Sequence, residues 1–243
     1  MDKTKKRGSA AEKAFFFAVA SSFIFSLIYI PIRASLDEIY RASTEYRIMI
    51  FQSAFGLAMI NLPTIMRKLF DWNIPAGFSI IFLLFLWSAI FAGEVLQFYY
   101  RIPMWDDILH LASSMMATVL GFSLVYILSG TKASKDRHLS PLLVSVFSAT
   151  FSVFIGVLWE IYEYAFDGIL SLNMQKFAVE SHGSPDILRD LSGRAALTDT
   201  MNDLIVDTLG ALIISILGYI SLKRSGKLFN SFRIYVKTDT SNE

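Results

Sequence analysis

The chain has 243 residues, of which 54% are hydrophobic and 18% are charged, and its formal net charge is +1. A soluble domain has about 25% charged residues, so the composition indicates a membrane protein, and the small net charge argues against a nucleic-acid partner. The absence of cysteine excludes disulfide frameworks, thiolate metal sites and cysteine nucleophiles.

Six apolar stretches follow one another along the chain, and each is long enough to cross a hydrocarbon core of ~30 Å as a helix. The predicted spans are about 14–32, 48–66, 74–95, 107–129, 141–165 and 203–222. We therefore predict an all-α fold, a polytopic membrane helical bundle of six transmembrane helices in a single domain surrounded by membrane lipids.

Lysine and arginine predict how the bundle is oriented. With the N-terminus inside, the inner segments contain 15 of these residues and the outer segments contain 7. Because cytoplasmic loops are enriched in positive charge, we expect both termini in the cytoplasm. The one long connection, 166–202, is then an outer loop, typical of a lid or binding element, with a short helix predicted near 187–191.

Ionisable side chains lie at or inside the same ends of the last three spans, where charge is costly and usually marks function. Within each span they are three or four residues apart, which places them on one helix face. They are Asp106 and His110 in the fourth span, Glu160 and Glu163 in the fifth, and Asp203 and Asp207 in the sixth. Glu94 and Gln97 end the third span on the same side and could join them.

Simpler explanations apply to part of this set. Asp107 could cap the start of the fourth helix, and Asp203 with Thr200 resembles a capping box. Capping cannot explain Glu160, because an acid near a helix C-terminus opposes the helix dipole. His110 lies a turn inside its span, where hydrogen bonding between helices is the alternative to a functional role.

The number of carboxylates itself predicts compensation. They cannot all stay ionised in a membrane unless a cation neutralises them or several retain protons. Oxygen ligands with one imidazole suit a divalent ion such as Mg²⁺, Mn²⁺, Fe²⁺ or Zn²⁺, and helical bundles build such sites from facing helices. We therefore predict a divalent metal site at these six residues. A proton or cation pathway and a hydrogen-bonded structural network remain the alternatives.

Three short blocks also carry a resemblance: Asp-x-x-x-His at 106–110, Glu-x-x-Glu at 160–163 after Trp159, and Asp203 to Asp207 leading into Gly210. At these residues the chain resembles the YjdF-like family of uncharacterised bacterial integral membrane proteins. It is more distantly similar to VanZ-like proteins, which tend to have Gln or Asn at positions 163 and 207. The resemblance covers about 97–222 and implies a multi-pass protein of the bacterial plasma (inner) membrane in a cell-envelope setting.

The function that we predict is a metal-dependent hydrolase or transferase, acting at the outer leaflet on a lipid-linked or phosphate-bearing envelope substrate. A proton- or cation-coupled transporter is the first alternative. A structural or partner-binding membrane protein with a polar network is the second. No serine-hydrolase elbow, phosphate-binding loop or dinucleotide fingerprint narrows the choice, and the sequence does not indicate an oligomeric state.

Overall fold

The structure is a computed structural model that describes residues 9–38, 45–129, 139–170, 174–175, 194–224 and 233–236. Its helices are α1 (Ala10–Leu36), α3 (Glu45–Met59), α4 (Leu62–Leu69), α5 (Ala76–Leu86), the π-helix η1 (Trp87–Val95), α6 (Phe98–Arg101), α7 (Trp105–Leu128), α8 (Pro141–Leu170) and α10 (Arg194–Arg224). Two short strands, β1 (Trp72–Asn73) and β2 (Tyr235–Val236), pair antiparallel. The predicted all-α architecture is confirmed, with this small strand pair added.

Among the described residues, six helical segments are long and apolar enough to cross a membrane, which confirms the predicted number of spans. They are residues 10–36, 46–69, 76–95, 105–128, 141–169 and 195–224. The second span joins α3 to α4, and the third joins α5 to η1. Large apolar side chains such as Phe17, Ile28 and Ile216 are exposed on the bundle surface, as lipid-facing residues are. The orientation of the bundle stays a prediction.

The connection predicted over 166–202 is shorter than expected at both ends. α8 continues to Leu170, and α10 already begins at Arg194. Hydropathy finds only the apolar part of a helix, whereas the backbone hydrogen bonds of the helix continue through polar residues. The short helix predicted near 187–191 lies outside the described residues.

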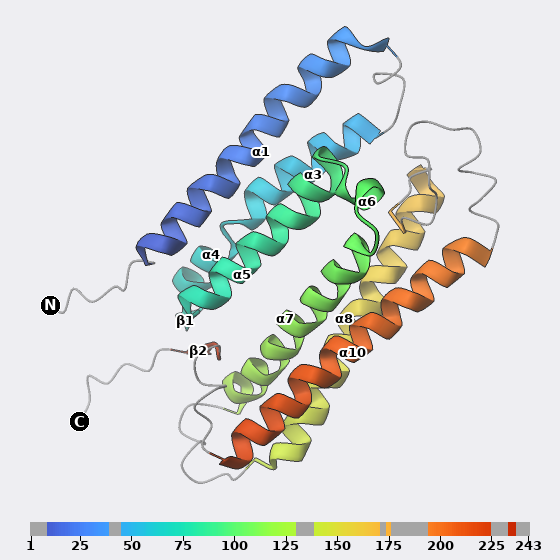
Figure 1. The fold of residues 1–243 in the computed structure, drawn as a ribbon. Helices are drawn as coiled ribbons and strands as arrows, with labels where there is room; N and C mark the ends of the chain where they lie inside the picture. The colour runs from blue at the N-terminus through green and yellow to red at the C-terminus, as the bar shows by residue number, and fades with distance from the viewer. Residues whose placement is uncertain are drawn as a thin grey trace, which may run out of the picture.

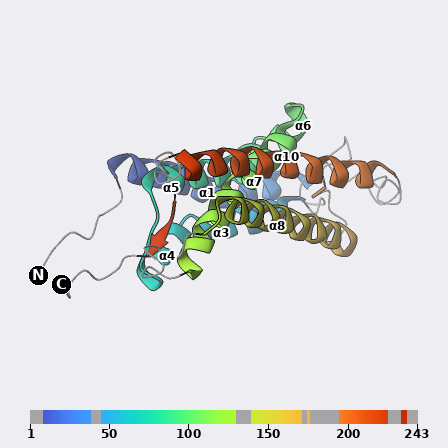
Figure 2. The same ribbon diagram turned by 90° about the horizontal axis from the view of Figure 1, so that it is seen from below.

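The helices form two groups of three spans (Figure 1). In the first group α1 packs against α3, α5 and η1, around an apolar core that includes Phe23, Ile60 and Leu83. In the second group α7, α8 and α10 all pack against one another, and Figure 2 shows α8 and α10 running along α7. The groups meet where α7 contacts α5, α6 and η1.

Small and hydroxyl side chains lie at the contacts between the helices of the second group and let them pack closely. Ser152 Oγ donates to the carbonyl oxygen of Ser114 at 2.7 Å, and Ser215 Oγ donates to that of Ser145 at 2.8 Å. Gly121 of α7 approaches α8 so closely that a Cβ there would lie 2.9 Å from Ser148 Cα. In lipid the hydrophobic effect does not drive helices together, because lipid tails are as apolar as the helix surface. Helices associate there through close backbone packing and hydrogen bonds between helices.

The two ends of the bundle differ. The end that carries α6 and the starts of α7 and α10 is called the site end here, and β1 and β2 lie at the opposite end (Figure 1). At the opposite end Arg67 of α4 forms an ion pair of 2.6 Å with Glu12 of α1. Ile234, next to β2, is buried against Ile74 and donates its N–H to Ser123 Oγ at 3.0 Å. The ion pair joins two helices of the first group, whereas Ile234 links that group to α7 at the end away from the site.

Candidate metal centre

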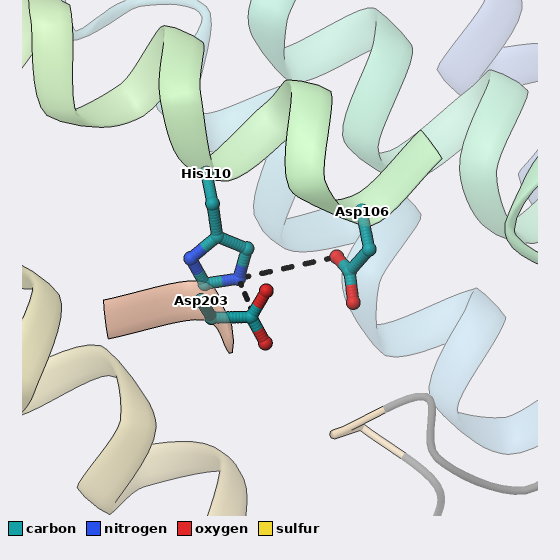
Figure 3. A group of neighbouring side chains, drawn as sticks. All are labelled: Asp106, His110 and Asp203. Atoms are coloured by element: carbon teal, nitrogen blue, oxygen red, sulfur yellow. Dashed lines mark ion pairs between the residues drawn. The ribbon is translucent and has the colours of Figure 1, made fainter. Parts of the chain in front are cut away.

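α7 carries an acid and a histidine on one inward face at the site end. It begins at Trp105, and Asp106 and Asp107 lie in its first turn, where the helix dipole favours negative charge. His110 follows one turn later and is only 5% exposed. Its Nε2 lies 4.0 Å from Oδ1 of Asp106 (Figure 3), so the two side chains that the sequence places on one face do meet.

The other two helices bring carboxylates to the same imidazole. Nε2 of His110 lies 3.9 Å from Oδ2 of Asp203 in α10 (Figure 3). On the other side of the ring, Nδ1 lies 3.5 Å from Oδ1 of Asp207. Nδ1 also lies 3.9 Å from Oε1 of Glu160 in α8. Carboxylates from three helices therefore surround one buried ring.

Two overlapping sets of side chains have the spacing of metal ligands. Asp106, His110 and Asp203 form the first set, and His110, Glu160 and Glu163 form the second. In each set the candidate ligand atoms lie within 4.8 Å of one another. Asp207 contacts Nδ1 of the same ring, so all six residues singled out from the sequence lie together. We call them the acidic cluster: Asp106, His110, Glu160, Glu163, Asp203 and Asp207.

The observed helix ends remove part of the capping explanation. α10 begins at Arg194, so Asp203 and Thr200 lie inside the helix. A capping box serves the free N–H groups of a first turn, and the capping alternative for Asp203 is therefore wrong. α8 continues past Glu160 to Leu170, so this carboxylate lies farther from the helix end than predicted.

Several carboxylate oxygens of the acidic cluster are buried without a donor. Glu160 is 4% exposed, and Asp203 and Asp207 are each 2% exposed. Within the part of the chain that the structure describes, no hydrogen bond reaches either oxygen of Glu160, Oδ2 of Asp203 or Oδ1 of Asp207. A buried ionised group without a hydrogen-bond donor is very costly, and one imidazole can carry only one positive charge among these carboxylates. The arrangement therefore requires protons or a cation among these oxygens.

Asp199 is a neighbour of the cluster that the sequence interpretation did not select. It lies one helical turn before Asp203, is half-buried, and interacts electrostatically with Asp106, Glu160 and His110. Its Oδ2 is buried and receives no hydrogen bond from the described residues. The spacing of four residues from Asp203 was a usable signal, but the predicted sixth span began only at 203 and left Asp199 in a loop.

Tyr99 of α6 adds a phenol beside the acidic cluster. Burial raises the pKa of its hydroxyl well above 10.0, and the negative charges of Asp106, Glu94 and Glu163 raise it further. The hydroxyl therefore stays protonated at neutral pH and can donate a hydrogen bond. Glu94 acts on the same phenol and accepts a hydrogen bond from Gln52 of α3 at 3.5 Å, whereas Gln97 lines a separate cavity.

A short segment beyond α8 is tied back to the site end. Asp167 is fully buried, and its Oδ1 and Oδ2 accept hydrogen bonds from the backbone N–H groups of Met174 at 2.6 Å and Gln175 at 3.1 Å. The Gln175 side chain in turn donates from Nε2 to Thr200 Oγ1 of α10 at 2.8 Å. These bonds hold residues 174–175 against α10. The contact at Thr200 lies about one helical turn from Asp203 of the acidic cluster.

Two glycines allow the cluster-bearing helices to approach one another. A Cβ at Gly156 of α8 would overlap Oδ2 of Asp207, and a Cβ at Gly210 of α10 would overlap Oγ of Ser114 in α7. Gly210 therefore lets α10 approach α7 closely. Without it, the carboxylates of α10 would lie farther from the imidazole of α7.

Comparisons with known proteins agree with this membrane architecture. Residues 17–224 match the family described as "Predicted membrane protein (DUF2238)". A protein of Thermotoga maritima described as "Uncharacterized protein" is 30% identical over 171 residues, which cover 69% of this chain and 73% of the relative. No solved structure matches the chain.

The chain belongs to the DUF2238 family of predicted membrane proteins. This confirms the expected resemblance to a family of uncharacterised membrane proteins. The more distant VanZ-like similarity stays a prediction.

Proposed function

We propose that this DUF2238 protein is a divalent-metal-dependent enzyme of the bacterial plasma membrane, with its metal centre in the acidic cluster. Asp106, His110 and Asp203 form the preferred ligand set. Glu160 and Asp207 face the other ring nitrogen, and Glu163 lies beside Glu160. The ion is Mg²⁺, Mn²⁺, Fe²⁺ or Zn²⁺. The reaction is a hydrolysis or group transfer on a lipid-linked or phosphate-bearing molecule of the cell envelope.

The spacing of the ligand atoms around His110 carries the proposal. Hydrogen bonds close at about 2.7–3.2 Å, whereas Nε2 lies 4.0 Å from the Asp106 oxygen and 3.9 Å from the Asp203 oxygen. Ligands that each lie about 2.1 Å from one tetrahedral ion are about 3.4 Å apart. The observed spacing is therefore slightly wider than that of a metal site and too wide for direct hydrogen bonding.

The second ring nitrogen supports the same assignment. A histidine that binds a metal through one nitrogen usually donates from the other nitrogen to a carboxylate, which fixes its tautomer and orientation. With Nε2 turned to Asp106 and Asp203, Nδ1 faces Asp207 at 3.5 Å, the shortest of these contacts of the ring and the one nearest to a hydrogen bond. The chain thus supplies both a ligand side and an orienting side on one imidazole.

The surrounding residues suit hydrolytic or transfer chemistry. A bound divalent ion supplies Lewis-acid polarisation of a water or phosphoryl oxygen. Asp199, one turn from Asp203, is placed to accept a proton from an attacking nucleophile. Tyr99 keeps its proton and can donate a hydrogen bond to developing negative charge.

The substrate setting follows from the predicted orientation. With both termini in the cytoplasm, as the distribution of Lys and Arg favours, the site end faces the outer leaflet. A centre at that depth can reach molecules that are held in the membrane and project polar groups into the envelope. We therefore assign an envelope lipid or lipid-linked carrier as the substrate class.

Metal binding is tested by unfolding the purified protein in detergent with Mn²⁺, Zn²⁺, Mg²⁺ or Fe²⁺ and with chelator. An ion at about 100 times its Kd stabilises a protein by about 2.7 kcal/mol when it binds only the folded state. Asp203→Asn should abolish this stabilisation. Asp107→Asn also removes one negative charge at the site end, but Asp107 lies outside both ligand sets. This variant should keep the stabilisation by the ion. Absence of any metal response in the unsubstituted protein would refute the metal centre.

The catalytic part has its own test. Phosphate release from short-chain lipid phosphates should require the stabilising ion, stop on chelation and fail with His110→Ala. If the ion binds but no envelope phosphate is turned over, the metal centre stands and the enzymatic assignment falls.

Ion-coupled transport is the rival that this site also invites, because imidazole and carboxylates can relay protons. Transport sites usually lie near the bilayer midplane between repeated halves, whereas Asp106 lies in the first turn of α7. Flux into proteoliposomes across a pH gradient, abolished by Asp207→Asn, would replace the enzymatic proposal with transport.

A further inference from the structure

A second polar cavity lies at the site end, in the first group of helices. Its volume is about 120 Å³, enough for several waters or one small polar group. α1, α3, η1 and α6 all contribute to its wall, which is lined by Tyr29, Ile30, Arg33, Met49, Val95, Gln97 and Arg101. None of these residues belongs to the acidic cluster.

The lining has the chemistry of an anion site. Two of the described lining residues are arginines, Arg33 and Arg101, and none is a carboxylate. Guanidinium groups bind phosphate oxygens through paired N–H donors. Tyr29 and Gln97 add polar side chains, and the remaining lining residues are apolar. A lining that combines cations with apolar side chains suits a phosphate attached to a hydrocarbon group.

α6 stands between this cavity and the acidic cluster. Gln97 and Arg101 are four residues apart, hence on one face, and both line the cavity. Tyr99 of the same short helix instead interacts electrostatically with Asp106 and Glu163 of the acidic cluster. One helical turn therefore presents cationic and amide groups to one site and a phenol to the other.

The backbone before α6 is held in an uncommon conformation. Gln97 has φ 64°, in the left-handed region that residues other than glycine rarely adopt. Its side-chain Nε2 donates to the carbonyl oxygen of Glu94 at 2.9 Å. Such strain persists where the surrounding structure requires it and clusters at ligand sites. Here it turns the chain from η1 into α6, so that Val95, Gln97 and Arg101 reach the same cavity.

We propose that this cavity binds a phosphate group through Arg33 and Arg101. The phosphate belongs either to a lipid headgroup or to a small soluble phosphate. Because α6 also borders the acidic cluster, a phosphate-bearing amphiphile held here is the substrate class of the enzyme. That last assignment rests on the proposed function, whereas the binding itself does not.

The test measures binding to the purified full-length protein in detergent with chelator present, so that no metal contributes. The probes are short-chain phosphatidate, the matching diacylglycerol without phosphate, and inorganic phosphate. We expect phosphatidate to bind at least tenfold more tightly than diacylglycerol. Arg101→Gln and Arg33→Gln should each weaken phosphatidate binding about tenfold, the loss of one charge-assisted contact of about 1.4 kcal/mol.

Arg47→Gln is the matched control. Arg47 lies on α3 at the same end of the bundle, is exposed, and does not line the cavity. This variant should bind phosphatidate like the unsubstituted protein. Arg33 and Arg101 are also exposed, so both Arg33→Gln and Arg101→Gln are expected to fold.

The outcomes separate the sources and the two proposals. Binding of phosphatidate without inorganic phosphate supports a lipid headgroup, and binding of both supports phosphate from either source. Equal binding of phosphatidate and diacylglycerol, no binding of any probe, or unchanged binding by Arg101→Gln would overturn the proposal. Arginine-dependent binding in a protein that shows no metal response would leave this site standing and remove only the metal centre.

Discussion

Replacing Gly210 with alanine tests whether close contact between α7 and α10 assembles the site. A Cβ at this position would overlap Ser114 Oγ and lie 3.0 Å from the carbonyl oxygen of Leu111. The Ser114 hydroxyl donates to that same carbonyl at 3.0 Å and can rotate away. The carbonyl belongs to the helix backbone, so α7 and α10 must separate.

The expected loss follows from two opposing effects. Forcing an extra carbon into a packed interior costs about 1–3 kcal/mol, while alanine in place of glycine in a helix gains about 1 kcal/mol at most. We expect Gly210→Ala to lower the free energy of unfolding by up to about 2 kcal/mol, after the gain in helix propensity is subtracted. It should also weaken metal binding, because α7 carries His110 and α10 carries Asp203.

Thermal unfolding in one detergent measures the first effect, and the same scan with added ion measures the second. Gly168→Ala is the matched control, because Gly168 lies in α8 and a Cβ there meets nothing within 4 Å. This variant should be neutral or slightly stabilised. If Gly210→Ala is as stable as Gly168→Ala and responds equally to the ion, the close contact does not position the cluster.

Two further predictions concern residues outside the acidic cluster, the Arg67–Glu12 ion pair and Tyr99. Arg67→Met should destabilise the protein by about 3 kcal/mol, because Arg67 pairs with Glu12 at 2.6 Å and also donates to Ser79 Oγ at 2.7 Å. Combining it with Glu12→Gln should recover part of that loss in the same detergent melt, and an unchanged deficit would argue against the pair. Tyr99 has a folded pKa well above 10.0, first through burial and then through nearby carboxylates. Its contribution to stability is therefore present below pH 10 and is lost as pH rises further. Tyr99→Phe should flatten the alkaline part of the stability profile, and an unchanged profile would contradict the assignment.

The acidic cluster shows which site residues can be predicted from residue spacing within one helix. The i,i+4 spacing of Asp106 and His110 fixes a shared helix face before any tertiary contact is known, and the structure shows that they do meet. Asp199 obeys the same spacing relative to Asp203, yet it was missed. Its neighbours are polar, and hydropathy therefore placed the helix start too late.

Arg33 and Arg101 show the opposite case. In the sequence each is an ordinary charge of an outer segment, and 67 positions separate them. Only the packing of α1 against α3 and η1, with α6 turned by the left-handed Gln97, brings them to one cavity. No periodic pattern within either helix encodes that meeting.

The amino-acid order alone determined the number of membrane helices, their approximate positions and the common end at which acids gather. These properties depend on hydrophobicity and helical repeat, which act within a few turns of chain. The tertiary structure decided which oxygens face one imidazole and which cations share a cavity. Those choices depend on side-chain contacts between helices far apart in sequence, such as Gly210 against Ser114, because a helix face can turn toward several partners until close packing selects one.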